Sequence, residues 1–235
     1  MPTVVIDCFP SSAHAYREEH AIVAVDVLRA TTTAQTAVAL GRRCFPVPSI
    51  EEALPLAARL EQPLLVGELG GNMPYGFDLQ NSPAQVAALE DSSRPMILLS
   101  TSGTPMLWES RGAHAVYVGS LRNLSAQATQ LAQTHEQVAL LAAGTRGEFR
   151  EEDQLCCAWL AAKLLADGYE AADERTAEIV RRWKGQPVDA LLVSNSVEYL
   201  KRTGQLVDVD FVLNHVDDLD QVFEFVEDEI VLRRG

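Results

Sequence analysis

AIVAVDVLRATTTAQTA, residues 21–37, joins an apolar run to a helix-like segment. The run Ala21–Leu28 is rich in valine, isoleucine and leucine with little alternation, which is typical of a strand covered on both faces. The segment Thr31–Leu40 then has the character of a helix. This stretch therefore predicts the first half of a βαβ unit.

The same alternation continues through the first two thirds of the chain. Further apolar runs lie at Val4–Phe9, Cys44–Val47, Leu64–Val66, Met96–Leu99, Ala115–Val118 and Val138–Ala142. Helix-like segments separate them at Ser49–Leu60, Pro83–Leu89, Pro105–Ser110 and Leu124–Gln133. Strands that alternate with helices of this length predict a three-layer α/β/α fold with a largely parallel or mixed sheet.

The character of the chain changes near Gly168. Helices are predicted at Glu151–Asp167, Ala171–Trp183 and Val188–Leu200, and short strands near Val207–Leu213 and Glu229–Leu232. No low-complexity linker interrupts the sequence. We expect residues 1–167 to form the main α/β domain with the functional loops. Residues 168–235 would form either a smaller C-terminal α/β subdomain or the completion of the same fold.

Composition excludes several classes of partner. The formal net charge of −14 repels nucleic acid and anionic membranes. The first residues, MPTVVIDCF, carry neither a basic segment nor a cleavage signature, so we expect a cytoplasmic protein. The four cysteines show no CxxC spacing, which favours reduced thiols over a zinc site or a disulfide framework.

Polar residues follow the predicted strands, where ligands collect in open α/β sheets. Asp26 lies late in the first quoted strand, Arg29 follows it, and Thr31 and Thr32 open the helix. A helix start suits a phosphate, an arginine suits an oxyanion, and a carboxylate suits a hard cation. The alternative is a threonine cap with a surface ion pair.

The loop after Leu64–Val66 is long and rich in glycine. It carries oxygen ligands and small residues at Glu68, Gly70, Gly71, Asp78, Asn81 and Ser82. Loops of this length in compact domains are usually functional, so an oxygen-ligand metal site or a substrate lid is predicted. A surface loop capped by Ser82 is the alternative.

Two further strand ends have the same composition. The predicted helix Pro105–Ser110 is preceded by Thr101, Ser102, Gly103 and Thr104. The predicted strand Val138–Ala142 is followed by Gly144 and Thr145, and the next predicted helix begins with acidic residues that include Glu152 and Asp153. Acidic residues in a first helical turn are also ordinary partners of the helix dipole. Together these loops favour phosphoryl transfer with Mg²⁺, which depends on positioning and charge neutralisation.

At these loops the chain resembles the 2-phosphosulfolactate phosphatase family. The matching segments are Asp26–Thr33, Gly67–Gly71, Gly76–Pro83, Ser102–Thr104 and Gly144–Cys156. The resemblance implies an α/β fold particular to that family. It also implies Mg²⁺-dependent hydrolysis of (R)-2-phospho-3-sulfolactate to 3-sulfolactate and phosphate, a reaction of coenzyme M biosynthesis.

Three positions depart from the family pattern. Leu69 stands where the family usually has arginine, and Ser102 stands where it usually has asparagine. The segment Ser194–Glu198 lacks the histidine and arginine that the family commonly carries near its C-terminus. These departures favour, as an alternative, a protein that binds a small phosphorylated ligand without turnover or acts on a different phospho-hydroxy acid.

The resulting hypothesis assigns a role to each candidate residue. The catalytic candidates are Asp26, Arg29, Glu68 and Asp153, and the Mg²⁺ candidates are Asp26, Glu68, Asp78 and Glu152. The phosphate-binding candidates are Thr31, Thr32, Gly70, Gly71, Asn81, Ser82, Thr101, Ser102, Gly103, Thr104, Gly144 and Thr145. The expected partner is a small anionic phosphate ester, and a homo-oligomer is compatible with the sequence.

Overall fold

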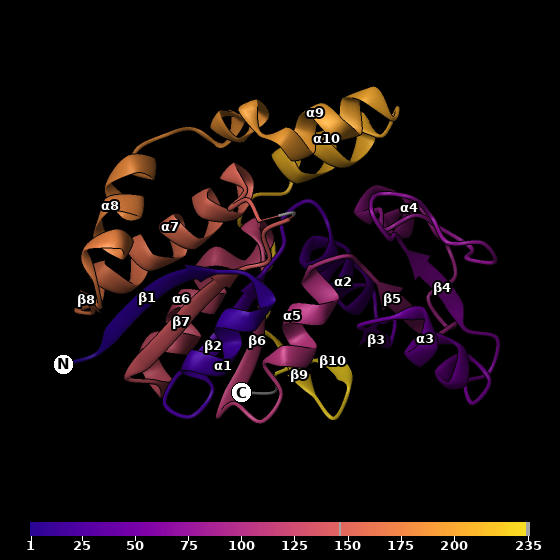
Figure 1. Cartoon of the computed structure of the whole chain (residues 1–235), viewed down its shortest axis with the longest axis horizontal. Helices are drawn as coiled ribbons and strands as arrows, with labels where there is room; N and C mark the ends of the chain where they lie inside the picture. The colour runs from indigo at the N-terminus through magenta and orange to yellow at the C-terminus, as the bar shows by residue number, and fades with distance from the viewer. Residues whose placement is uncertain (146, 234–235) are drawn as a thin grey trace.

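The computed structural model describes residues 1–145 and 147–233 and contains one ten-stranded sheet (Figure 1). The strands are β1 (Thr3–Cys8), β2 (Ala21–Val25), β3 (Cys44–Val47), β4 (Leu64–Gly67), β5 (Met96–Leu99), β6 (Ala115–Gly119), β7 (Gln137–Ala142), β8 (Glu170–Ala171), β9 (Phe223–Val226) and β10 (Glu229–Leu232). Their spatial order is β4-β5-β3-β10-β9-β6-β2-β7-β1-β8. The predicted mixed α/β/α fold is confirmed.

Helices connect most of the strands. They are α1 (Ala13–Tyr16), α2 (Ala30–Ala39), α3 (Ile50–Ala57), α4 (Pro83–Ala87), α5 (Gly103–Glu109), α6 (Leu124–Thr134), α7 (Glu151–Ala166), α8 (Glu174–Trp183), α9 (Asn195–Arg202) and α10 (Leu206–Asn214). Short 3-10 helices lie at η1 (Pro10–Ser12), η2 (Leu121–Asn123) and η3 (Val188–Val193). None of the helices in the described ranges is both long and apolar enough to span a bilayer.

The C-terminal hairpin lies in the middle of the sheet. Strands β9 and β10 pair antiparallel with each other, and they join β6 on one side to β3 on the other. The two flanking groups of strands, β4-β5-β3 and β6-β2-β7-β1-β8, are parallel within themselves. The last strands of the chain therefore complete the sheet that the first strands begin.

Twist brings the carboxyl ends of the two parallel groups together. Three antiparallel pairings separate the groups, so without twist their strands would point in opposite directions. From β2 to β5 there are five neighbour steps, and at roughly 20–25° each they rotate the strand direction by roughly 100–125°. The loops that follow β2, β4, β5 and β7 can therefore meet at one place.

Helices cover both faces of the sheet. Helices α6, α7 and α8 pack on one face against residues such as Val23 and Leu140, and α1, α2 and α5 pack on the other against Ile22 and Leu141. Figure 1 shows α9 and α10 lying together across the top of the sheet. These two helices close over the strand ends from which the polar loops emerge.

One predicted element is wrong. Val207–Leu213 is predicted as a strand, but it lies in α10 although apolar and acidic residues alternate at 207–210. Val209 and Val212, which are three residues apart on one face of that helix, are buried. Burial of this helical face against the core favours a helix more strongly than the local alternation favours a strand.

Candidate active site

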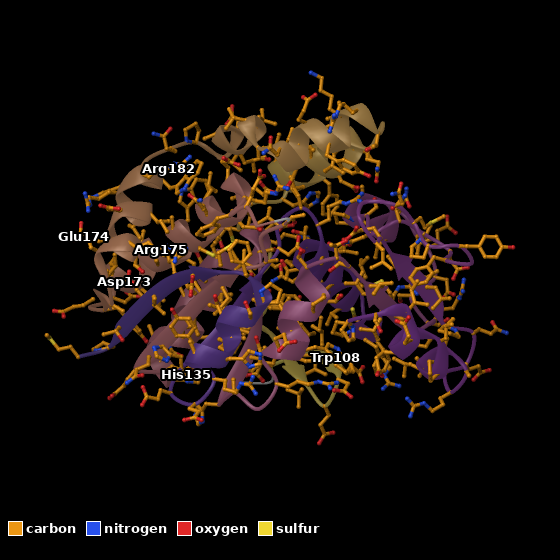
Figure 2. All side chains as sticks on the ribbon, viewed as in Figure 1. Trp108, His135, Asp173, Glu174, Arg175 and Arg182 are labelled. Carbon is orange, nitrogen blue, oxygen red and sulfur yellow. The ribbon has the colours of Figure 1, made fainter. Side chains whose placement is uncertain are left out.

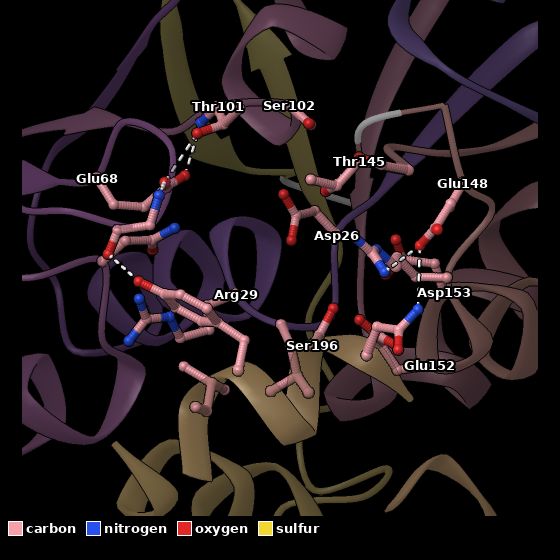
Figure 3. A pocket seen from close by; sticks show the side chains of 18 of the residues that line it. Asp26, Arg29, Glu68, Thr101, Ser102, Thr145, Glu148, Glu152, Asp153 and Ser196 are labelled. Atoms are coloured by element: carbon pink, nitrogen blue, oxygen red, sulfur yellow. Dashed lines mark hydrogen bonds and ion pairs between the residues drawn. The ribbon is translucent and has the colours of Figure 1, made fainter. Parts of the chain in front are cut away.

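A cavity of about 470 Å³ lies where the loops after β2, β4, β5 and β7 face α9 (Figure 3). Its lining includes residues from all four loops, from the start of α7 and from α9. The predicted convergence of these loops is therefore observed. No histidine is among the described residues that line it, and His135, labelled in Figure 2, lies toward the opposite end of the sheet.

Asp26 stands at the centre of the site, directly after β2. The N–H group of Ala30 donates to its Oδ1 over 3.2 Å. Its other oxygen lies so close to Gly103 that a Cβ atom at that position would stand 2.4 Å from Oδ2. Gly103 is therefore needed because it lets α5 begin against this carboxylate. Burial raises the pKa of Asp26 to about 7, and the negative charges of Glu68 and Glu152 act in the same direction.

Glu152 and Asp153 form a second acidic group at the start of α7. Both side chains are buried, with 1% and 3% of the residue exposed. Asp153 Oδ1 accepts the N–H of Val27 over 2.8 Å, which fixes α7 against the loop after β2. Burial raises the pKa of both carboxyl groups, and for Asp153 the charges of Glu152 and Asp26 raise it further.

This acidic cluster has the chemistry of a site for a hard cation. Glu152 Oε2 is buried without a hydrogen-bond partner among the described residues. The charges of Glu152 and Asp26 raise the pKa of Asp153, and the charge of Glu152 also raises the pKa of Asp26, so a cation would stabilise the charged forms. No group of three or more histidine, cysteine or acidic side chains in the described part of the chain is arranged to enclose a metal by itself. Mg²⁺ usually takes only one or two protein carboxylates and keeps several waters, so the residues present suit it.

Glu68 lines the cavity but its oxygens already accept hydrogen bonds. Oε1 accepts the N–H of Thr101 over 2.7 Å, and Oε2 accepts the Thr101 hydroxyl over 2.8 Å and the N–H of Gly71 over 2.6 Å. Figure 3 shows these bonds on the side of the cavity opposite Glu148 and Asp153. Glu68 therefore ties the loop after β4 to the loop after β5.

Asp78 does not reach the cavity. Its Oδ2 accepts the N–H of Leu65 over 2.9 Å and pairs with Arg94 over 3.3 Å. These contacts hold the long loop against β4, on the outer side of the sheet. The structure therefore does not bring Asp78 together with the other predicted metal ligands. The sequence pattern could not show this, because it does not reveal the direction in which the loop turns.

The predicted phosphate-binding residues fall into two groups. Those that line the cavity are Gly70, Gly71, Asn81, Thr101, Ser102, Gly144 and Thr145. The others, Thr31, Thr32, Ser82, Gly103 and Thr104, are absent from the lining and lie behind it. The hydroxyls of Thr31 and Thr32 donate to the carbonyls of Asp26 and Val27, so they hold the loop that carries Asp26 and do not face a ligand.

Three arginines supply positive charge to the walls of the cavity. Arg29 was predicted, whereas Arg150 and Arg202 were not singled out. Arg150 pairs with Glu148 over 2.6 Å, and its Nε is buried without a partner among the described residues. Leu69 does not line the cavity. Although this chain lacks the arginine that the family usually has at that position, the cavity still contains the three arginine side chains.

Helix α9 forms the wall that the sequence did not predict. Asn195, Ser196, Glu198 and Tyr199 line the cavity from this side. The Tyr199 hydroxyl donates to the carbonyl of Gly71 over 2.7 Å. A Cβ atom on Gly71 would lie 2.2 Å from that hydroxyl oxygen, so only glycine allows the contact. The only sequence signal for this wall was that Ser194–Glu198 occupies the place of a family motif.

The fold and the cavity together define an α/β enzyme with an acidic small-molecule site at its strand ends. A family model described as 2-phosphosulpholactate phosphatase matches residues 8–228. The chain belongs to the 2-phosphosulfolactate phosphatase family, and this membership makes it a phosphatase.

Curated relatives agree with the family match. A protein of Carboxydothermus hydrogenoformans is 35% identical over 203 residues, which cover 80% of this chain and 84% of the relative. One of Pseudothermotoga lettingae is 34% identical over 218 residues, covering 91% and 93%. One of Thermus thermophilus is 34% identical over 212 residues, covering 88% and 87%. Each is named a probable 2-phosphosulfolactate phosphatase.

Proposed function

We propose that the protein hydrolyses (R)-2-phospho-3-sulfolactate to 3-sulfolactate and phosphate in a Mg²⁺-dependent reaction in the cytoplasm. The names of its relatives support the substrate. A cavity of about 470 Å³ is of the size that small-molecule sites usually have. The proposal places the chain in coenzyme M biosynthesis.

The observation that carries the proposal is the buried cluster of Asp26, Glu152 and Asp153. The pKa of all three carboxyl groups is raised, so their charged forms are unfavourable without a counter-charge, which a divalent cation would supply. We assign Asp26 and Glu152 as the residues that hold Mg²⁺, in preference to Glu68, whose oxygens accept other hydrogen bonds, and Asp78, which does not line the cavity. When bound, Mg²⁺ would neutralise charge on the phosphoryl oxygens.

The arginines and the loop backbone hold the anionic ends of the substrate. Arg29 and Arg150 both line the cavity, and a guanidinium group binds a phosphate or sulfonate through two parallel hydrogen bonds. Ser102 and Thr145 lie close to Asp26 in Figure 3. We place the phosphoryl group there.

Asp153 is the proposed source of the proton that the leaving group needs. Burial and the charges of Glu152 and Asp26 raise the pKa of Asp153, which is the direction that a general acid requires. As the ester P–O bond breaks, this proton passes to the oxygen of the departing hydroxy acid. The water that completes the hydrolysis returns a proton to Asp153, so the enzyme ends the cycle unchanged.

A second candidate substrate is a phospho-hydroxy acid without the sulfonate. Glu198 lines the cavity, and its negative charge opposes a second strongly anionic group. The test is phosphate release from phosphosulfolactate and from phospholactate at matched Mg²⁺ concentrations. A higher kcat/KM for phosphosulfolactate supports the main proposal. A preference for phospholactate assigns the second substrate, and no release from either ester refutes both.

A further inference from the structure

Arg29 rests on a buried acidic residue of α10. Its Nη1 donates to Asp208 Oδ2 over 2.6 Å and to Gln205 Oε1 over 2.6 Å. The side chains of Arg29 and Asp208 are only 4% and 1% exposed. The two residues are 179 positions apart in the sequence, so this ion pair joins the loop after β2 to the C-terminal part of the chain.

The carboxylate of Asp208 is itself fixed from the other side. Its Oδ1 accepts the hydroxyl of Ser82 and, over 3.3 Å, the N–H of Ala84. Both donors belong to the start of α4, which packs against α2 and α10. Asp208 is therefore held by α4 while it holds Arg29, and it has little freedom to turn.

The hydrogen-bond inventory of Arg29 leaves one edge of the guanidinium free. An arginine has five N–H donors, and the two on Nη1 are used by Gln205 and Asp208. Within residues 1–145 and 147–233, no acceptor is bonded to Nε or Nη2. Nε and Nη2 together form the fork that binds a carboxylate, phosphate or sulfonate through two parallel bonds.

We propose that Asp208 is a positioning residue that orients Arg29 so that its Nε–Nη2 edge receives an anionic group of the substrate. The inference rests on the proposed function of the cavity that Arg29 lines. Asp208 does not line the cavity, so it acts only through Arg29. Gln205 supplies a second, uncharged contact to the same Nη1 atom.

A purely structural ion pair makes a different prediction. If Asp208 only stabilised the fold, its replacement would lower the melting temperature without selectively weakening anion binding. If it orients Arg29, replacement weakens the binding of anions in the ground state and the transition state alike. KM then rises while kcat changes little, which is the pattern for uniform binding.

The experiment compares Asp208→Asn with Asp210→Asn, a matched charge change at an exposed position of the same helix. Calorimetry measures the Kd of inorganic phosphate in the presence of Mg²⁺, and steady-state kinetics give KM and kcat. We expect Asp208→Asn to raise both Kd and KM by about tenfold to a hundredfold, as for loss of a charge-assisted bond, with little change in kcat. Asp210→Asn should match the native protein.

Arg29→Gln completes a double-mutant cycle. If Asp208 acts through Arg29, the double variant has the same phosphate Kd as Arg29→Gln alone. Multiplicative losses in the double variant would overturn the proposal. Should Asp208→Asn not fold, Asp208→Glu decides, because it keeps the buried charge but moves the carboxylate that holds Nη1 of Arg29. A phosphate Kd unchanged from the native value in that variant would also overturn it.

These results separate the inference from the proposed function. Native protein that binds phosphate but hydrolyses neither ester refutes the proposed function alone, and the Kd values still test Asp208. Native protein that fails to bind phosphate overturns the inference. Native activity combined with an unaltered phosphate Kd in Asp208→Asn overturns the inference alone.

Discussion

Replacing Asp26 with asparagine removes one charge from the buried acidic cluster and keeps the size of the side chain. Burial is the main reason that the pKa of Asp26 rises from 3.8 to about 7 on folding. The folded state therefore binds this proton more tightly than the unfolded state. Stability falls as the pH rises from the unfolded value to the folded value, and the full penalty is present above about pH 7.

The size of the effect follows from these two pKa values. A rise from 3.8 to about 7 corresponds to about 4 kcal/mol of stability lost above the folded pKa. Glu152 and Asp153 titrate with Asp26, so neutralising one member recovers part of this amount. We expect Asp26→Asn to gain about 2 kcal/mol without metal, which raises Tm by roughly 4–8 °C for a chain of this length.

The assay is thermal unfolding in EDTA at about pH 8 and about pH 5, since these values bracket the folded pKa. Asp26→Asn should melt above the native protein at the higher pH and close to it at the lower pH, where the native carboxyl group is protonated. In Mg²⁺ the same variant should lose on the order of a thousandfold in kcat/KM, or about 4 kcal/mol of transition-state stabilisation. Asp210→Asn is the control for both measurements.

One combination of results would refute the reasoning. If Asp26→Asn melts lower than the native protein at both pH values and keeps its kcat/KM, Asp26 is a structural residue. Its carboxylate would then serve the N–H of Ala30, and the acidic cluster would have no part in catalysis.

Three further predictions concern α9 and the thiols. Glu198→Gln should lower KM for phosphosulfolactate about threefold to tenfold with kcat unchanged, because a repelling charge leaves the cavity wall; steady-state kinetics would contradict this if KM rose. Tyr199→Phe should lower the free energy of unfolding by about 1 kcal/mol through loss of the bond to Gly71, as read from urea denaturation, and an unchanged midpoint would count against that contact. Burial raises the pKa of Cys8 to about 12, and all four cysteines are buried. Ellman's reagent should therefore label the native protein slowly and all four thiols after unfolding, whereas rapid native labelling would contradict the burial.

The elements that the sequence predicts correctly are those with strong local signals. Ala21–Val25 is uniformly apolar and forms a strand that is buried on both faces. Pro83 is the first residue of α4, as predicted, whereas α5 begins at Gly103, two residues before the predicted start at Pro105. Since carboxyl ends of parallel strands collect ligands, the polar residues after these strands could be assigned to one site.

The errors come from contacts between distant parts of the chain. The alternation Val-Asp-Val-Asp in residues 207–210 predicts a strand, but the buried face of α10 and the bond from Arg29 to Asp208 require a helix. No local pattern reveals that bond, because its partners come from opposite ends of the sequence. For the same reason α9 was not predicted as a wall of the site, and Arg150 and Arg202 were overlooked.

The insertion of β9 and β10 between β6 and β3 has a similar origin. The segment Glu229–Leu232 is correctly predicted as a strand. Its central position in the sheet was not predicted, because it depends on pairing with β3 and, through β9, with β6, and these strands come together only in the folded protein. Strand propensity is local, and strand order is a property of the whole sheet.

Phosphate release from phosphosulfolactate, before and after EDTA, tests the central claim most directly. We predict that native protein releases phosphate with Mg²⁺ present, that EDTA abolishes the release, and that added Mg²⁺ restores it, because the proposed ligands Asp26 and Glu152 would then bind the cation again. Undiminished release in EDTA would contradict the assignment of the acidic cluster as a Mg²⁺ site, and no release in any condition would contradict the proposed reaction itself.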